Sequence, residues 1–168
     1  SLGTIRCNPW YTQQSLLMGD AAHAIVPFYG QGMNCAMEDV CVFDQCLDRT
    51  PDDWHTAFQA YQNLRKKDTD AIADLALENY TEMRDHVDNP NFIAKRQIEM
   101  QLEKKYPDYA SKYNLVTFRE DIGYAEAKER GHAQDDWLLD YCSRTDTSHL
   151  TDEQLENIFR QLSMGNLQ

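Results

Sequence analysis

The chain has 168 residues, of which 42% are hydrophobic, and carries a formal net charge of −12. This length is enough for a domain with a buried core. The composition argues against nucleic-acid binding, because 28 acidic residues outnumber 16 basic ones and no basic stripe is present to neutralise phosphates. No apolar run approaches the roughly 20 residues that span a bilayer, so we expect no membrane segment.

The five cysteines form no CxxC pair, and their odd number fits a disulfide framework poorly. We therefore expect a reducing compartment and a cytoplasmic location, although a longer parent protein could still carry a membrane anchor. The five histidines show neither HExxH nor zinc-finger spacing. No metal site is expected.

The first elements predicted are two short strands, Thr4–Cys7 and Ser15–Met18, joined by a polar connection. Helical spacing follows, with Asn34 as the predicted N-cap. The residues expected on the inner face of this helix are Met37, Val40, Cys41 and Leu47.

Strong helix-start signals follow, with a hydroxyl or amide cap before a proline at Thr50-Pro51 and again at Asn89-Pro90. An apolar stripe from Trp54 to Met83 predicts one long helix, or two helices joined near residues 66–70. Pro107 should end the helix that begins at Asn89-Pro90.

The remainder of the chain also has a mainly helical pattern. Leu115–Phe118 is predicted to be a brief extended or buried segment, whereas Tyr124–Tyr141 has helical spacing. The final helix should begin with a capping box between Thr151 and Gln154 and end at Gly165.

The most informative segment for function is 19–39, where a short apolar run leads into a Gly-rich turn and then a helix. Asp20 lies where α/β proteins hold ribose or ribityl hydroxyls, although it could equally cap the turn. Pro27 makes the following loop rigid. Residues 30–34 present successive backbone N–H groups at a helix start, which favours a ligand edge that gains negative charge.

This segment resembles the second FAD-binding motif of single-component flavoprotein aromatic hydroxylases. The matching motifs are Gly-Asp-Ala-Ala-His at 19–23, then Pro27, Gly30-Gln31-Gly32, Asn34 and Glu38-Asp39. The resemblance implies FAD as cofactor and NADPH as co-substrate, with flavin chemistry and no side chain acting as a direct acid or base. The cofactor contacts that it implies are Gly19, Asp20, Pro27, Gly30, Gln31, Gly32, Met33 and Asn34.

Within that family, the branch that hydroxylates L-kynurenine is the most similar, on residues 26–34, 76–85, Tyr113 and 115–118. From the residues alone, Asn79 in an apolar helix stripe binds either a ligand or a neighbouring backbone group. The resemblance implies that Asn79 and Tyr113 hold the amino-acid end of L-kynurenine, which dioxygen converts to 3-hydroxykynurenine in tryptophan catabolism. The substrate contacts that it implies are Phe28, Tyr29, Asn79 and Tyr113, with Glu82, Met83 and Thr117 nearby.

The fold class expected is an α-rich fragment of an α/β FAD-dependent monooxygenase. Two short strands and a flavin-binding turn would precede a bundle of long helices. Residues 1–49 would complete an FAD-binding domain, and residues 50–168 would cover the substrate pocket. The chain lacks a GxGxxG after a first strand. We therefore expect the carboxy-terminal portion of a longer enzyme, inactive without its amino-terminal half.

Two other functions stay open. One is an aromatic hydroxylase for a phenol, a benzoate or a quinone precursor, against which Asn79 and Tyr113 argue. The other is a non-catalytic helical interaction module with a vestigial flavin turn. The intact Asp20, Pro27 and Gly30 argue against this second alternative, because a decayed turn should have lost some of them.

Overall fold

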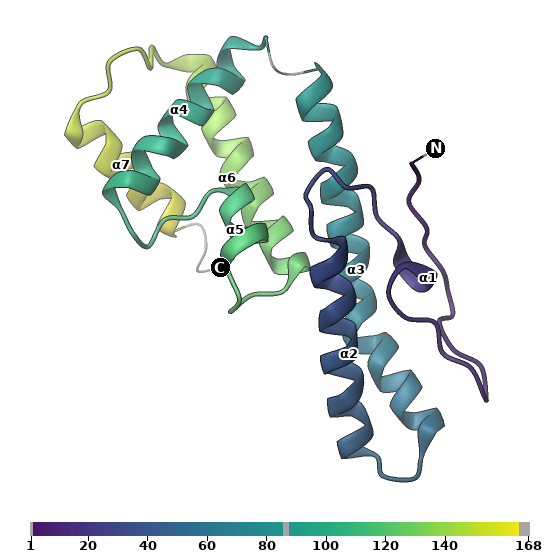
Figure 1. Ribbon diagram of the computed structural model, residues 1–168. Helices are drawn as coiled ribbons and strands as arrows, with labels where there is room; N and C mark the ends of the chain where they lie inside the picture. Colours follow the sequence, from purple (N-terminus) through teal and green to yellow (C-terminus); the bar gives the residue numbers. More distant parts are fainter. Residues whose placement is uncertain (1, 86–87, 165–168) are drawn as a thin grey trace. The chain divides into compact units, whose positions relative to one another are not determined.

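A computed structural model describes residues 2–85 and 88–164. They form the helices α1 (Asp20–His23), α2 (Gly32–Arg49), α3 (Trp54–Asp85), α4 (Pro90–Lys105), α5 (Lys112–Phe118), α6 (Tyr124–Arg144) and α7 (Asp152–Met164) (Figure 1). The α-rich character that we expected is confirmed. Among the described residues, no helix is long and apolar enough to cross a membrane.

The chain divides into two compact units, Ser1–Tyr80 and Thr81–Gln168, and the boundary falls inside α3. It does not coincide with the functional division after Arg49 that the sequence suggests, and that division stays a prediction. Unit 1 contains the segment with the flavin motif. Unit 2 contains α4 to α7.

The two predicted strands are wrong, because no strand forms among the described residues and only an isolated bridge joins Tyr11 to Leu16. The backbone N–H groups of Ile5 and Cys7 instead donate to the carbonyls of Ala24 and Ala22, at 2.8 and 3.1 Å. The segment therefore runs extended against the loop around α1. A strand needs a hydrogen-bonded partner backbone along its length, and the two predicted segments pair with neighbouring backbone at too few positions.

In unit 1, α2 runs alongside the first half of α3 (Figure 1). The start of α2 differs from the prediction, because Gln31 and not Asn34 is the N-cap residue, and Asn34 donates its amide to Gln31 Oε1 at 2.8 Å. The predicted inner face is also wrong for Met37, Val40 and Cys41, which are exposed. The buried face carries Cys35, Asp39 and Cys46 instead.

The prediction of a long helix is confirmed in its single-helix form, since α3 runs unbroken from Trp54 to Asp85. Its start lies later than predicted. Thr50 ends α2, and the Asp53 carboxylate accepts hydrogen bonds from the Thr56 N–H at 3.1 Å and its Oγ1 at 2.7 Å. One core cluster joins the N-terminal segment, α1, α2 and α3, and its buried residues are Trp10, Ala22, Cys46, Ala57 and Tyr61.

Unit 2 confirms two of the predicted helix starts. Asn89 accepts hydrogen bonds from the N–H groups of Asn91 and Phe92, and Pro90 is the first residue of α4. Thr151 and Gln154 form the reciprocal capping box, with bonds of 2.9 and 3.2 Å. One core cluster of the unit comprises Ile98, Leu102, Tyr109, Leu138, Cys142, Leu155, Ile158 and Leu162. The end predicted at Gly165 lies outside the described residues.

The extended form predicted at Leu115–Phe118 is wrong, because these residues belong to α5, whereas the predicted burial is confirmed for Leu115 and Val116. Ser111 caps this helix by accepting a hydrogen bond from the Asn114 N–H. α5 packs on α6 at Gly131, where a Cβ would lie 2.5 Å from Lys112 Cγ. This close approach buries Leu115 and Val116, and such a tertiary contact is invisible to a local sequence pattern.

Candidate functional site

The Gly-rich turn before α2 is open at the point where a ligand would approach. Gly30 has φ +70°, which favours glycine, and a Cβ built there would meet no atom within 4 Å. Its N–H donates to the Pro27 carbonyl at 3.1 Å, which closes the turn. At the start of α2 that follows, Gln31 makes no side-chain cap. The first N–H groups of the helix are therefore left for water or a ligand.

A buried carboxylate ties this turn region to both long helices of unit 1. Asp39 on α2 is 0% exposed. Its Oδ2 accepts a hydrogen bond from the Gly19 N–H at 3.0 Å and lies 2.5 Å from His23 Nε2. Its Oδ1 accepts a hydrogen bond from Arg65 Nε on α3 at 2.8 Å. One side chain thus joins Gly19, α1, α2 and α3.

Asp39 and Arg65 are both stabilised in their ionised forms. Burial by itself disfavours the Asp39 carboxylate, but the hydrogen bonds from His23 and Arg65 outweigh it and hold its pKa below the ordinary value. Burial likewise disfavours the Arg65 guanidinium, and its hydrogen bond to Asp39 raises its pKa nonetheless. Arg65 also lies 2.9 Å from Glu38 Oε2. Asp39 and Arg65 therefore form a buried ion pair, and each of the two side chains has further polar partners.

His23, Cys35 and Asp39 place their ligating atoms within 4.8 Å of one another, as a metal site would. The Arg65 guanidinium contacts the same cluster, because its Nη2 donates to the Cys35 carbonyl at 3.2 Å and lies 3.3 Å from the Cys35 Sγ. Burial also raises the pKa of the Cys35 thiol to about 12, so the free thiol is protonated at neutral pH. This cluster is an ion-pair network that fixes the loop.

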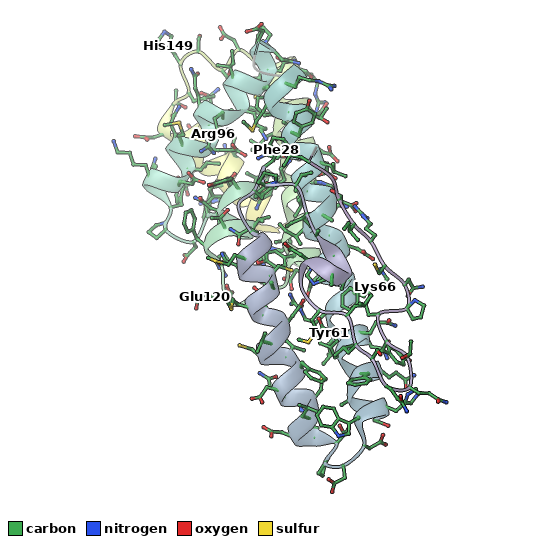
Figure 2. The ribbon with its side chains drawn as sticks, turned by 45° about the vertical axis from the view of Figure 1, so that its right-hand side comes forward. Phe28, Tyr61, Lys66, Arg96, Glu120 and His149 are labelled. Carbon is green, nitrogen blue, oxygen red and sulfur yellow. The ribbon has the colours of Figure 1, made fainter. Side chains whose placement is uncertain are left out.

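The aromatic part of the loop is attached to the far half of α3 within unit 1. Asn79 Nδ2 donates to the Phe28 carbonyl at 2.7 Å, and the Phe28 ring lies 4.7 Å from the ring of Tyr80. Tyr29 is 7% exposed. Figure 2 shows Phe28 in the loop that leads into α2. The backbone partner that the residue pattern allowed for Asn79 is therefore present.

The other predicted substrate residues belong to unit 2. Lys112 Nζ donates to Glu82 Oε1 at 2.6 Å and also pairs with Asp135 at 2.7 Å. Tyr113 packs edge-on against Phe118 at 6.2 Å. Met83 is 59% exposed, and the buried Thr117 Oγ1 has no hydrogen-bond partner among the described residues.

The predicted site residues thus fall into two sets. Unit 1 brings the turn, Phe28 and Asn79 together, with Asp20 exposed as the first residue of α1. Unit 2 holds the set that comprises Glu82, Met83, Tyr113 and Thr117.

Sequence reasoning missed the contacts of Asp39 with Arg65 and His23. The only local signal was Asp39 on an otherwise amphipathic helix, and its partner Arg65 lies 26 residues away in a run of basic residues. It also missed the Phe28–Tyr80 ring contact, for which the residue pattern gives no signal.

Comparisons with known proteins show which sequences this chain is similar to. Residues 2–47 match the family described as the FAD binding domain. Over 160 residues the chain is 42% identical to a kynurenine 3-monooxygenase of Legionella pneumophila (strain Corby), an alignment that covers 94% of this chain. Residues 2–47 belong to the FAD binding domain family. The cofactor is therefore FAD.

Two further relatives agree. The kynurenine 3-monooxygenases of Cytophaga hutchinsonii and Myxococcus xanthus are each 44% identical to this flavoprotein chain, over 132 and 137 residues. These alignments cover 77% and 80% of the chain. The chain spans about a third of the length of the curated relatives it matches, 35% of the Legionella protein and 29% of the other two.

The geometry of the turn fits the cofactor. The open space at Gly30 admits a bulky ligand to the backbone, and the uncapped start of α2 offers N–H donors. An anionic or polarised edge, such as the pyrimidine side of a flavin, matches those donors and the positive end of the helix dipole.

Proposed function

We propose that this chain is part of a monooxygenase that hydroxylates L-kynurenine to 3-hydroxykynurenine, with NADPH as co-substrate and dioxygen as oxygen source. The observation that carries the proposal is the open, uncapped turn at the start of α2, inside the FAD binding segment and tied to α3 by Asn79. The names of the relatives supply the substrate. A cytoplasmic location stays a prediction from the composition.

In this proposal the turn holds the polar edge of the flavin. Gly32, Met33 and Asn34 donate from the helix start, and Gly30 and Gln31 allow the close approach. Asp20 binds the ribityl chain, Gly19 positions it, and Pro27 lies beside the ring system. FAD, when bound, supplies the electron transfer and oxygen activation, and the protein supplies orientation and exclusion of water.

The substrate residues have a positioning role in this proposal. Phe28 and Tyr29 form an aromatic surface under the flavin, and Asn79 fixes that surface through the Phe28 carbonyl while it binds the amino-acid end of L-kynurenine. Tyr113, Glu82, Met83 and Thr117 are the further substrate contacts of the proposal, and all four belong to unit 2. No side chain of the chain acts as a direct acid or base.

The isolated chain is expected to bind FAD weakly or not at all, and to be inactive. It spans about a third of the length of its relatives, so the proposal places the adenosine site and one wall of the flavin pocket in the remaining part. Titration of FAD with the purified chain, followed by quenching of flavin fluorescence, tests this prediction. Tight stoichiometric binding would contradict it.

Asn79→Ala in the full-length protein is expected to raise the KM for L-kynurenine about tenfold, the effect of losing a hydrogen bond of about 1.5 kcal/mol. The kcat should change less, because the residue orients and does not react. Asn63→Ala, an exposed amide on the same helix, is the matched control. Steady-state kinetics with L-kynurenine measure both constants, and an unchanged KM and kcat would remove Asn79 from the site.

NADPH consumption by the full-length protein tests the substrate assignment. L-Kynurenine should stimulate NADPH oxidation, whereas 4-hydroxybenzoate and phenol should not. Stimulation by a phenolic acid alone would favour the other aromatic hydroxylases, and no NADPH oxidation with any aromatic compound would favour a non-catalytic module.

A further inference from the structure

One buried lysine in unit 2 joins α5 to the last turn of α3 and to α6. Lys112, the first residue of α5, is 7% exposed. Its Nζ donates to Glu82 Oε1 on α3 at 2.6 Å and lies 2.7 Å from Asp135 Oδ2 on α6. Burial disfavours the Lys112 ammonium, but the Asp135 and Glu82 carboxylates outweigh it and raise its pKa. Lys112 is therefore charged and held between two carboxylates.

The stem of Lys112 has a fixed place as well. It crosses α6 at Gly131, where a Cβ would lie 2.5 Å from Lys112 Cγ and 2.8 Å from its Cβ. Because a packed interior does not tolerate distances this short, a side chain at position 131 would displace the lysine. The glycine and the two carboxylates together define one position for the ammonium.

The two helices that Lys112 joins carry the predicted substrate residues of unit 2. Glu82 precedes Met83 in the last turn of α3. Tyr113 follows Lys112 directly on α5, and Thr117 lies one turn later. If residues from both helices contact one small molecule, the two helices must keep a constant separation. The hydrogen bond between Lys112 and Glu82 fixes that separation.

A second buried lysine shows what Lys112 adds. Lys95 on α4 is 4% exposed, and its Nζ donates to Asp135 Oδ1 at 2.6 Å and lies 3.6 Å from Glu99 Oε1. Asp135 therefore has a cationic partner without Lys112. α4 carries none of the predicted substrate residues, so the contribution specific to Lys112 is its hydrogen bond to Glu82.

We propose that Lys112 is a positioning residue for substrate binding, because it holds Glu82 on α3 in a fixed place relative to Tyr113 on α5. The inference rests on the proposed function, which assigns substrate contacts to both helices. Lys112 acts through those residues and does not take part in the reaction itself. Its loss should therefore weaken the binding and alignment of the substrate more than it slows turnover.

Two lysine substitutions in the full-length protein, supplied with FAD and NADPH, separate positioning from folding. Lys112→Met should raise the KM for L-kynurenine at least about tenfold, with a smaller change in kcat and less product per NADPH consumed. Lys95→Met, matched in burial and in its contact with Asp135, should lose similar thermal stability but keep its KM within about twofold. Lys112→Arg keeps the stem and the charge, so it should restore most of the KM.

Hydrogen exchange of the backbone amides, located by mass spectrometry, is a readout that needs no activity. Lys112→Met should speed exchange over residues 112–118, and Lys95→Met should speed it over residues 90–105 instead. If Lys112→Met does not fold, Gly131→Ala displaces the same stem without a change of charge and should raise the KM likewise.

Three results would overturn the inference: equal KM values for the two lysine variants, unchanged exchange over residues 112–118 in Lys112→Met, or an unchanged KM for Gly131→Ala. A protein that forms no 3-hydroxykynurenine, but whose exchange responds as expected, would count against the proposed function alone.

Discussion

Asp39→Asn is expected to lower the free energy of unfolding by about 3–5 kcal/mol, the cost of leaving a buried charge without its partner. Arg65 is 5% exposed and donates a hydrogen bond from Nε to Asp39, and His23 contacts the same carboxylate. An amide at position 39 keeps the shape of the side chain but removes the negative charge. Urea denaturation followed by circular dichroism measures the loss.

Glu38→Gln is the matched control for this experiment. Glu38 pairs with the same Arg65 at 2.9 Å, but its side chain is 46% exposed, so its loss should cost less than about 1 kcal/mol. Equal effects of the two substitutions would contradict the view that Asp39 is the anchor of the turn region.

The acid sensitivity of the chain should change with the same substitution. Since the folded-state pKa of Asp39 is lowered, its contribution to stability is present above the ordinary value of 3.8 and is lost as the pH falls through the folded-state pKa. The wild type should therefore lose more stability than Asp39→Asn between neutral pH and the region below 3.8. Melting temperatures over this range measure the difference.

Gly30→Ala is expected to weaken FAD binding by the full-length protein about tenfold or more, equivalent to losing one hydrogen bond of about 1.5 kcal/mol. A Cβ at Gly30 meets no atom of the chain within 4 Å, so it would point into the space left for a ligand. The φ of +70° adds a strain of about 1–2 kcal/mol to folding. Flavin fluorescence titration measures the affinity, and urea denaturation measures the strain separately.

Gly3→Ala provides the comparison, because its Cβ also meets no atom within 4 Å and its φ is not in the left-handed region. It should change neither FAD affinity nor stability. An unchanged FAD affinity for Gly30→Ala would show that the flavin does not approach this turn.

The elements that were predictable from the sequence are those with strong local signals. The apolar stripe of α3 persists over its whole length, and the caps at Asn89 and Thr151 use side chains within three residues of their partners. Such interactions form wherever the local pattern places the groups, whatever the rest of the fold does.

The elements that were predicted wrongly depend on contacts between residues that lie far apart in the sequence. α2 turns Asp39 inward to meet Arg65, which leaves Met37 and Val40 exposed against the apolar pattern. Likewise, α5 forms where Gly131 of α6 allows Lys112 to approach closely. A local pattern contains neither contact, because the partners lie 26 and 19 residues away.

The turn that opens α2 was predictable, because its motif is a contiguous stretch of sequence, and its contacts with FAD stay a proposal. The network that holds the turn region was not predictable, since Asp39, His23 and Arg65 come from three separate segments. The pattern around Asn79 also did not indicate its partner, because its amide donates to the carbonyl of the distant Phe28. A substrate contact by Asn79 stays a proposal.

The most direct test of the central claim is the product of the reaction. The full-length protein, supplied with FAD, NADPH, L-kynurenine and isotopically labelled dioxygen, is analysed by mass spectrometry. The account predicts 3-hydroxykynurenine that carries one labelled oxygen atom. Unchanged L-kynurenine from a protein that retains FAD, or labelled product only from a different aromatic acid, would contradict it.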